Sequence, residues 1–204
     1  MHSGLTTLSI LGAIDKHQNL TDVGRKMAVL PVDPRFSRMI LASEELGCSQ
    51  EVVDIVSVLS ASSRLFSGIS NDNSSAAGAR EKLSHPSGDH YTILNAFRAY
   101  QEVISSSTSG EAKAWCARNF LNERALSEAM EIQHQLMGIC KWIGINAALS
   151  CGGQVQPILR CLVLGLVQNA AFIQPTGLYK QVMGPSVSCA FGRVGWKCSW
   201  VSRL

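Results

Sequence analysis

The sequence predicts a mainly α-helical protein with short β segments near its two ends. Of the 204 residues, 46% are hydrophobic and 16% are charged, so the chain can bury a core. Aromatic residues make up only 6%, which is low for an all-β sandwich. Apolar residues recur at helical spacing between capping signals over residues 34–168, and this pattern places most of the chain in helices.

The first 33 residues are expected to hold two short helices and, between them, two short strands. The first apolar stretch ends at Gly12, and residues 15–19 are polar enough to form a turn between the strands. Thr21 suits the N-cap of the second helix, Asp22 suits its positive end, and Pro31 stops it. This order of elements is typical of the end of a winged-helix module.

Capping signals mark the helices of the central region. Asp33 and Pro34 suit the N-cap and the first position of a helix that Gly47 ends. Ser49 is expected to cap the next helix, and residues 67–78 read as a polar linker. Further helices are predicted over residues 79–83, 89–103, 111–120, 124–142 and 154–166, with a loop at 105–110.

The C-terminal end changes character. Residues 170–173 and 178–182 predict two strands around a turn at 174–177. The residues that follow fit neither the helical nor the strand period, so no regular structure is expected there.

Charge is distributed unevenly along the chain. The net charge is +3, but twelve basic and fifteen acidic residues lie within 1–131, whereas six basic residues and no acidic residue lie within 132–204. An acid-free basic end suits a polyanion surface. A short, Gly-rich apolar end also carries few charges of either sign, and the sequence leaves both interpretations open. The six basic residues are Lys141, Arg160, Lys180, Arg193, Lys197 and Arg203.

No catalytic or metal-binding motif occurs in the sequence. It contains no GxxxxGK[ST], HExxH, GxSxG or GxGxxG pattern, and no two of its seven cysteines have CxxC spacing. We therefore expect no catalytic residue, no metal site and no cofactor bound by this chain. The residues alone indicate a helical binding or coupling module.

Neither the longest apolar run nor the N-terminus of the sequence predicts contact with a membrane. The apolar run 158–167 is far shorter than the ~20 residues of a membrane span and contains Arg160. The N-terminus shows no signal peptide, so reduced thiols in an intracellular compartment are the expectation.

Five blocks of sequence occur in a fixed order along residues 8–182. They are LGAID with LTDVGRKMAVLPVDPRF within 11–36, GCSQEV from Gly47, GDH from Gly88 with LN at 94–95, WCARNFLNER from Trp115, and ILRCLVLGLVQNAA from Ile158. In this order the blocks resemble the C-terminal region of the DEAH-box RNA helicases.

The resemblance implies a helical bundle with a partial winged helix before it and a truncated OB-like β segment after it. The implied domains are the end of the winged helix at 1–33, the helical helicase-associated (ratchet) domain at 34–168, and the first OB-like strands at 169–187. An irregular tail follows at 188–204. The two motor domains, which in this family bind ATP and Mg, would lie upstream.

The resemblance also implies contact with single-stranded RNA, over which the ratchet domain closes. The implied donors to phosphate are Arg124, Arg160 and Lys180, with Asn95 and Asn122 as neutral hydrogen-bonding groups. For each arginine, a surface ion pair or a helix-end charge is the competing interpretation. Arg25 and Lys26 are expected to face RNA, a protein activator or, as is commoner for such residues, solvent. The structural motif residues are Asp33, Pro34, Gly88, Asp89, His90 and Trp115.

Roles for three of these motif residues are expected within the protein itself. Asp89 is expected to cap its helix, His90 to hold the loop–helix junction, and Trp115 to anchor the core.

The chain departs from the family pattern at two places. Gln133 stands where the family usually has an arginine, so a family ion pair or RNA contact is in question there. The residues after Val187 do not follow the family, and we interpret them as a read-through or frame-shifted tail. An incomplete barrel would leave unpaired strand edges prone to aggregation.

The expected function is an accessory part of a DEAH-box ATP-dependent RNA helicase that has no turnover by itself. It would bind single-stranded RNA weakly and couple motor closure to RNA movement, in the nucleus or nucleolus, during pre-rRNA processing or pre-mRNA splicing. Its partners would be the motor domains or an activator protein. The alternatives are a non-catalytic helical protein-interaction module and a non-functional truncated helicase fragment.

Overall fold

The structure is a computed structural model, and it describes residues 2–67, 74–106, 109–175, 179–181 and 188–189. These residues divide into two compact units. The first unit holds residues up to 53 and those from 136 onward, and the second holds residues 54–135. Each unit is described separately below.

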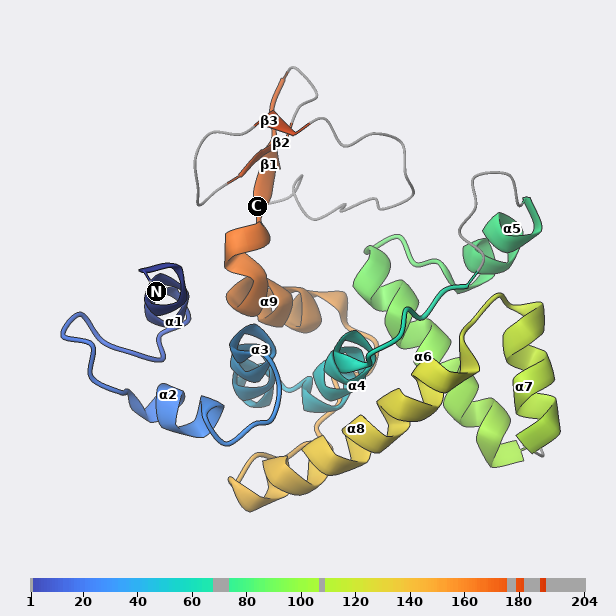
Figure 1. Ribbon diagram of the computed structural model, residues 1–204, viewed down its shortest axis with the longest axis horizontal. Helices are drawn as coiled ribbons and strands as arrows, with labels where there is room; N and C mark the ends of the chain where they lie inside the picture. The colour runs from blue at the N-terminus through green and yellow to red at the C-terminus, as the bar shows by residue number, and fades with distance from the viewer. Residues whose placement is uncertain (1, 68–73, 107–108, 176–178, 182–187, 190–204) are drawn as a thin grey trace. The chain divides into compact units, whose positions relative to one another are not determined.

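The first unit contains the two ends of the described chain. Its complete elements are α1 (His2–Ile10), α2 (Asp22–Met27), α3 (Pro34–Glu45), α9 (Val155–Leu166), the 3-10 helix η1 (Val167–Asn169), β1 (Ala171–Ile173), β2 (Tyr179–Gln181) and β3 (Ser188–Cys189). It also holds the start of α4 (Ser49–Ser60) and the end of α8 (Glu123–Trp142). The second unit adds α5 (Ser74–Leu83), α6 (Asp89–Ser106) and α7 (Ser109–Arg118). The mainly α-helical fold class is therefore confirmed (Figure 1).

Two of the expected N-caps form as the sequence predicts. Thr21 precedes α2, and its Oγ1 accepts a hydrogen bond from the Gly24 amide at 3.0 Å. Asp33 precedes α3, with Pro34 in the first turn, and its Oδ1 accepts from the Arg35 amide at 2.9 Å. The Arg35 guanidinium also pairs with this carboxylate and holds its pKa below the usual value.

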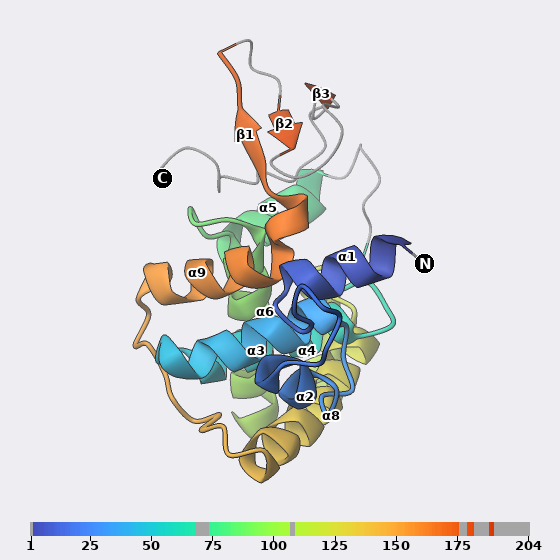
Figure 2. The ribbon, with the colours of Figure 1, turned by 90° about the vertical axis from the view of Figure 1, so that its left-hand side faces the viewer.

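Helices α3 and α9 pack closely against each other and run side by side in both views (Figures 1 and 2). The buried residues of α9 are Ile158, Cys161, Leu162 and Gly165. A Cβ atom at Gly165 would lie 2.5 Å from the Arg35 carbonyl oxygen and would overlap the Met39 side chain. Glycine is therefore required here for the two helices to approach.

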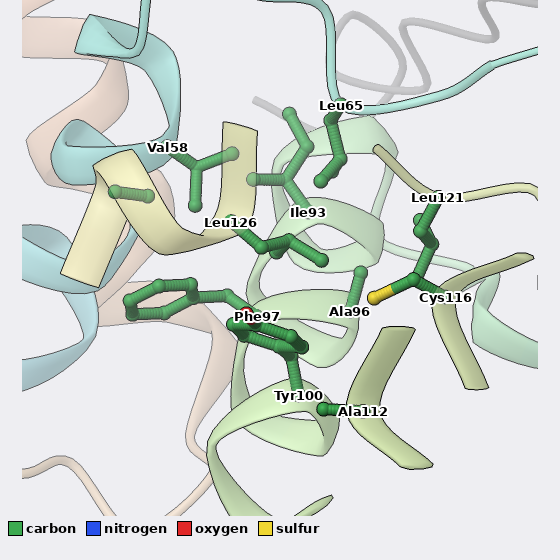
Figure 3. Packing of buried hydrophobic residues seen from close by; sticks show 11 residues of the cluster. Val58, Leu65, Ile93, Ala96, Phe97, Tyr100, Ala112, Cys116, Leu121 and Leu126 are labelled. Carbon is green, nitrogen blue, oxygen red and sulfur yellow. The ribbon is translucent and has the colours of Figure 1, made fainter. Parts of the chain in front are cut away.

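The second unit has its own hydrophobic core. Figure 3 shows the Phe97 and Tyr100 side chains of α6 in one cluster with Leu126 of α8 and Cys116 of α7. The fully or largely buried members are Val58, Leu65, Ile93, Ala96, Phe97, Tyr100, Ala112, Cys116, Leu121, Leu126 and Ala129. Burial raises the pKa of Tyr100 to about 12 and that of Cys116 to about 11, so both stay neutral at physiological pH.

A small antiparallel sheet follows α9 in the order β1–β2–β3. Ala171 pairs with Gln181, Phe172 with Lys180, and Ile173 with Tyr179. The strands lie beyond the C-terminal end of α9 in both views (Figures 1 and 2). The β segment expected after the helices is thus present.

The structure differs from several local expectations. The strands around residues 15–19 shorten to one bridge between Ile14 and Leu20, because Asp15 accepts from the Asn19 amide and closes a tight turn. Residue Ser49 begins α4 but does not cap it: its buried hydroxyl has no hydrogen-bond partner among the described residues.

Three boundaries also move. Helix α5 begins at Ser74, within the expected linker, and α6 continues to Ser106, into the expected loop at 105–110. Residues Ser188 and Cys189, expected in the irregular tail, pair with β2. The rest of that tail, residues 190–204, lies outside the described residues, as do 68–73, 107–108, 176–178 and 182–187. These ranges include the end of the expected turn at 174–177 and both ends of the expected strand at 178–182.

Candidate functional site

The loop 61–67, here called the strap, is held against the start of α8 by Asn122. The Asn122 amide nitrogen Nδ2 donates to the Arg64 carbonyl oxygen at 3.2 Å, and its backbone N–H donates to the Leu65 carbonyl oxygen at 2.8 Å. Its Oδ1 accepts from the Ala125 amide at 3.5 Å, in the first turn of α8. This candidate RNA contact is thus engaged in joining two chain segments.

Arg124 is exposed in the first turn of α8, one turn before Glu128. Ser62 of the strap donates to the Glu128 carboxylate through its hydroxyl at 2.7 Å and its amide at 3.0 Å. These bonds, with a smaller contribution from the Arg124 charge, hold the pKa of Glu128 below its usual value. The guanidinium therefore has a carboxylate neighbour and still faces solvent.

The third candidate in the second unit is Asn95 on α6. Its Nδ2 donates to the Leu83 carbonyl oxygen at 3.2 Å and so ties α6 to the C-terminal end of α5. The side chain is half-buried. The structure gives it an internal partner in addition to any contact it makes outside the protein.

The two remaining candidates lie in the first unit. Arg160 is exposed on α9, on the side away from the buried residues that face α3, and Lys180 is exposed on β2. Lys141, near the end of α8, is exposed as well. These three cations belong to the stretch 132–204, which has no acidic residue.

The GDH motif forms the start of α6. Gly88 has a φ of +111°, which favours glycine, and its carbonyl oxygen accepts from the Thr92 amide at 3.2 Å. Gly88 therefore takes the N-cap position, and Asp89 lies in the first turn instead of capping the helix as expected. Burial lowers the pKa of His90, which favours the neutral imidazole.

The preceding loop is fixed by His85. Its ring stacks on Tyr91 with the ring centroids 4.6 Å apart, and its Nδ1 accepts from the Ser87 amide at 3.1 Å. Trp115, on α7, is partly buried and packs against the core of the second unit.

A buried polar network that the sequence did not predict surrounds Asp54 on α4. The Asp54 side chain is 2% exposed, and its Oδ2 lies 3.2 Å from Nε of Arg98 on α6. Gln133 of α8 donates to Oδ1 of the same carboxylate and accepts from Nε2 of Gln101 at 3.0 Å. Gln133, where the family pattern has an arginine, thus serves as a hydrogen-bonded member of this network while Arg98 supplies the charge.

A second unpredicted cluster lies at the start of α4 in the first unit. Glu51 is buried and accepts from the Ser150 hydroxyl at 2.6 Å. The sulfur atoms of Cys48 and Cys161 lie 3.5 Å apart in the interior. The hydrogen bond with Cys161 and burial raise the pKa of Cys48, so it is a neutral thiol and a poor nucleophile.

The described residues contain no group of three or more His, Cys, Asp or Glu side chains placed to hold a metal ion. Within the same ranges, no helix combines the length and the hydropathy that crossing a bilayer demands.

The chain matches two family models in succession. Residues 4–32 match the helicase associated domain (HA2), winged-helix, and residues 33–93 match the helicase associated domain (HA2), ratchet-like. The junction between them falls at Asp33, the N-cap of α3.

The chain is also similar to curated full-length proteins. The ATP-dependent RNA helicase DHX33 of Homo sapiens is 35% identical over 182 residues, which are 88% of this chain and 25% of that protein. DHX33 of Drosophila melanogaster is 33% identical over 186 residues, 90% of this chain and 26% of that protein. DHX33 of Mus musculus is 32% identical over 182 residues.

The chain thus spans about a quarter of the length of these relatives. Both the order of the two matched domains and the similarity along nearly nine-tenths of the chain agree with the helical architecture. This chain therefore belongs to the C-terminal helicase-associated region of the DEAH-box RNA helicases.

Proposed function

We propose that this chain is the RNA-contacting accessory part of an ATP-dependent RNA helicase and couples closure of the motor domains to movement of single-stranded RNA. The supporting observation is the exposure of Lys141, Arg160 and Lys180 within a stretch that has no acidic residue. Exposed cations in a stretch without acidic residues favour a polyanion partner. The sheet after α9 would be the start of an OB-like barrel.

The matched relatives are helicases three-quarters of whose length lies outside this chain. The proposal therefore assigns ATP and Mg to the motor domains of the same helicase, which would be the principal partner. It also places the protein in the nucleus or nucleolus, in pre-rRNA processing or pre-mRNA splicing. Fluorescence microscopy of the tagged full-length protein tests this location, and exclusion from the nucleus would contradict it.

Binding to single-stranded RNA should weaken steeply as salt concentration rises. The slope of log K against log salt concentration is negative, and each lost phosphate contact makes it shallower by about 0.7 for a single strand. The single substitutions Arg160→Gln and Lys180→Gln should each make the slope shallower by about that amount. Fluorescence anisotropy of a labelled oligouridine measures the slope. Lys113→Gln, an exposed cation on α7, is the matched control and should leave the slope unchanged. A wild-type chain that fails to bind RNA at low salt would refute the proposal.

A second candidate function is a protein-interaction module without RNA. It is favoured by Trp142, whose side chain is 77% exposed at the end of α8, because exposed tryptophans often anchor protein interfaces. In that case Trp142→Ala should weaken binding to the separately expressed motor domains, with little dependence on salt. Unchanged binding to the motor domains would remove this candidate.

A further inference from the structure

One face of the β1–β2 ladder presents an aromatic ring beside an ammonium group. Phe172 of β1 is the direct partner of Lys180 of β2 in the antiparallel register. Residues opposite each other in such a ladder share a face, with Cβ atoms about 4.5–5.5 Å apart. Phe172 is 53% exposed and Lys180 is exposed, so both side chains reach solvent from the same side of the sheet.

The surroundings of this pair in the sequence favour an anionic ligand. Residues 132–204 hold six lysines and arginines and no aspartate or glutamate, so the segment that forms the sheet offers Lys180 no carboxylate. A ring left in solvent has lost the hydrophobic gain of burial. A ligand that combines a flat apolar face with a negative charge would satisfy both side chains.

A nucleotide in a single strand has both of these groups. Every nucleobase has a π-face that can stack on an aromatic side chain, and the phosphate lies next to it in the chain. Lysine acts as a point charge toward phosphate and does not require a fixed geometry. Because the two side chains are cross-strand neighbours, one nucleotide can contact both.

We propose that Phe172 and Lys180 form a base-stacking and phosphate-binding pair for single-stranded RNA on the open face of this sheet. The inference rests on the RNA-binding function proposed above and adds a stacking residue, Phe172, to it. Stacking is tolerant of sequence, so the pair would grip RNA without selecting a base. The basic stretch favours RNA over a protein partner as the occupant.

The test compares two labelled dodecamers with the full 204-residue chain. One is oligouridine RNA, and the other carries the same sugar–phosphate backbone with abasic sites. Phe172→Ala and Phe172→Leu should weaken binding to oligouridine by roughly 5- to 150-fold, the range that corresponds to one stacked base, and leave abasic binding unchanged. Lys180→Gln should weaken binding to both oligomers. Trp142→Ala, a change at another exposed aromatic residue, should weaken neither.

The outcomes separate this inference from the function on which it rests. A wild-type chain that binds neither dodecamer at low salt refutes the RNA-binding function itself. If the wild type binds with the expected salt dependence and both Phe172 variants bind oligouridine as tightly, only the stacking pair is refuted. Equal losses on both dodecamers, with an unchanged circular dichroism spectrum, would also refute stacking. Weakened binding to the motor domains, with RNA binding intact, would reassign the face to a protein partner.

Discussion

Removing Arg98 should destabilise the protein far more than removing an arginine from a surface ion pair. The Nε of Arg98 lies 3.2 Å from the carboxylate of Asp54, whose side chain is only 2% exposed. At an effective dielectric constant of about 20, Coulomb attraction at that distance is about 5 kcal/mol. The guanidinium is 36% exposed and Gln133 stays hydrogen-bonded to Asp54, so only part of this energy should be lost. We expect Arg98→Met to lower the free energy of unfolding by about 2–3 kcal/mol.

The pair Arg25–Asp22 provides the matched control. Its charged atoms are 2.5 Å apart, but the side chains are 60% and 91% exposed. Arg25→Met should therefore cost only about 0.2–0.5 kcal/mol. Urea denaturation followed by circular dichroism measures both values, and the larger loss corresponds to a fall in Tm of about 4–12 °C for a chain of this size.

A second substitution tests whether Gln133 and Arg98 share one task. In the Arg98→Met background, Gln133→Arg supplies a new guanidinium next to Asp54 and should recover about 1 kcal/mol or more, which a double-mutant cycle measures. The reasoning is refuted if Arg98→Met costs no more than Arg25→Met. It is also refuted if Gln133→Arg destabilises the Arg98→Met background as much as it does the wild type.

Three further predictions follow from other parts of the structure. Gly165→Ala should lower the free energy of unfolding by about 1–3 kcal/mol, because the new Cβ meets the α3 backbone. The control Gly138→Ala, on an exposed part of α8, should raise the free energy of unfolding by about 0.5–1 kcal/mol, and urea midpoints that shift in the same direction for both variants would contradict this. Burial lowers the pKa of His90 below the value of about 6.5 in the unfolded chain, so stability should fall as the pH drops below about 6.5. His90→Gln should therefore flatten a plot of urea midpoint against pH between 8 and 5, and an equally steep plot for the variant would rule this out. In the native chain at pH 8, the partly exposed Cys151 should be alkylated by a maleimide before the buried Cys48, as resolved by peptide mass spectrometry, and the reverse order would show that the interior opens faster than expected.

The sequence predicted features that depend on neighbouring residues. Thr21 and Asp33 cap helices as expected, because a cap needs a side chain and an amide only two or three residues apart. Ser49 was predicted wrongly by the same rule. The helix begins one residue early, at Ser49 itself, so its side chain is buried in the first turn and cannot reach the capping position.

Features that join distant segments were not predicted. Asp54 finds its partners 44 and 79 residues away, and Cys48 meets Cys161 across 113 residues. A single sequence carries no local signal for such pairs. The family pattern pointed to Gln133 only as a departure, and the geometry shows that its amide serves as both donor and acceptor there.

The RNA-contact candidates lie between these two cases. Residue type and the family pattern singled out Asn95 and Asn122. Only the structure shows that their side-chain amides donate to backbone carbonyl oxygens of distant residues. The exposure of Arg160 and Lys180 agrees with the charge pattern of the sequence, and their role toward RNA stays a prediction. Phe172 was missed because an isolated apolar residue in a short strand is ordinarily assigned to a core.

The strap has a consequence for the order in which the second unit folds. Ser62 and Glu128 are 66 residues apart, and Arg64 and Asn122 are 58 apart, so these bonds close a loop that contains α5, α6 and α7. The entropy of closing such a loop must be overcome before the bonds contribute. The α6–α7 pair should therefore form first and the strap should dock late, which makes its amides the earliest in this unit to exchange with deuterium.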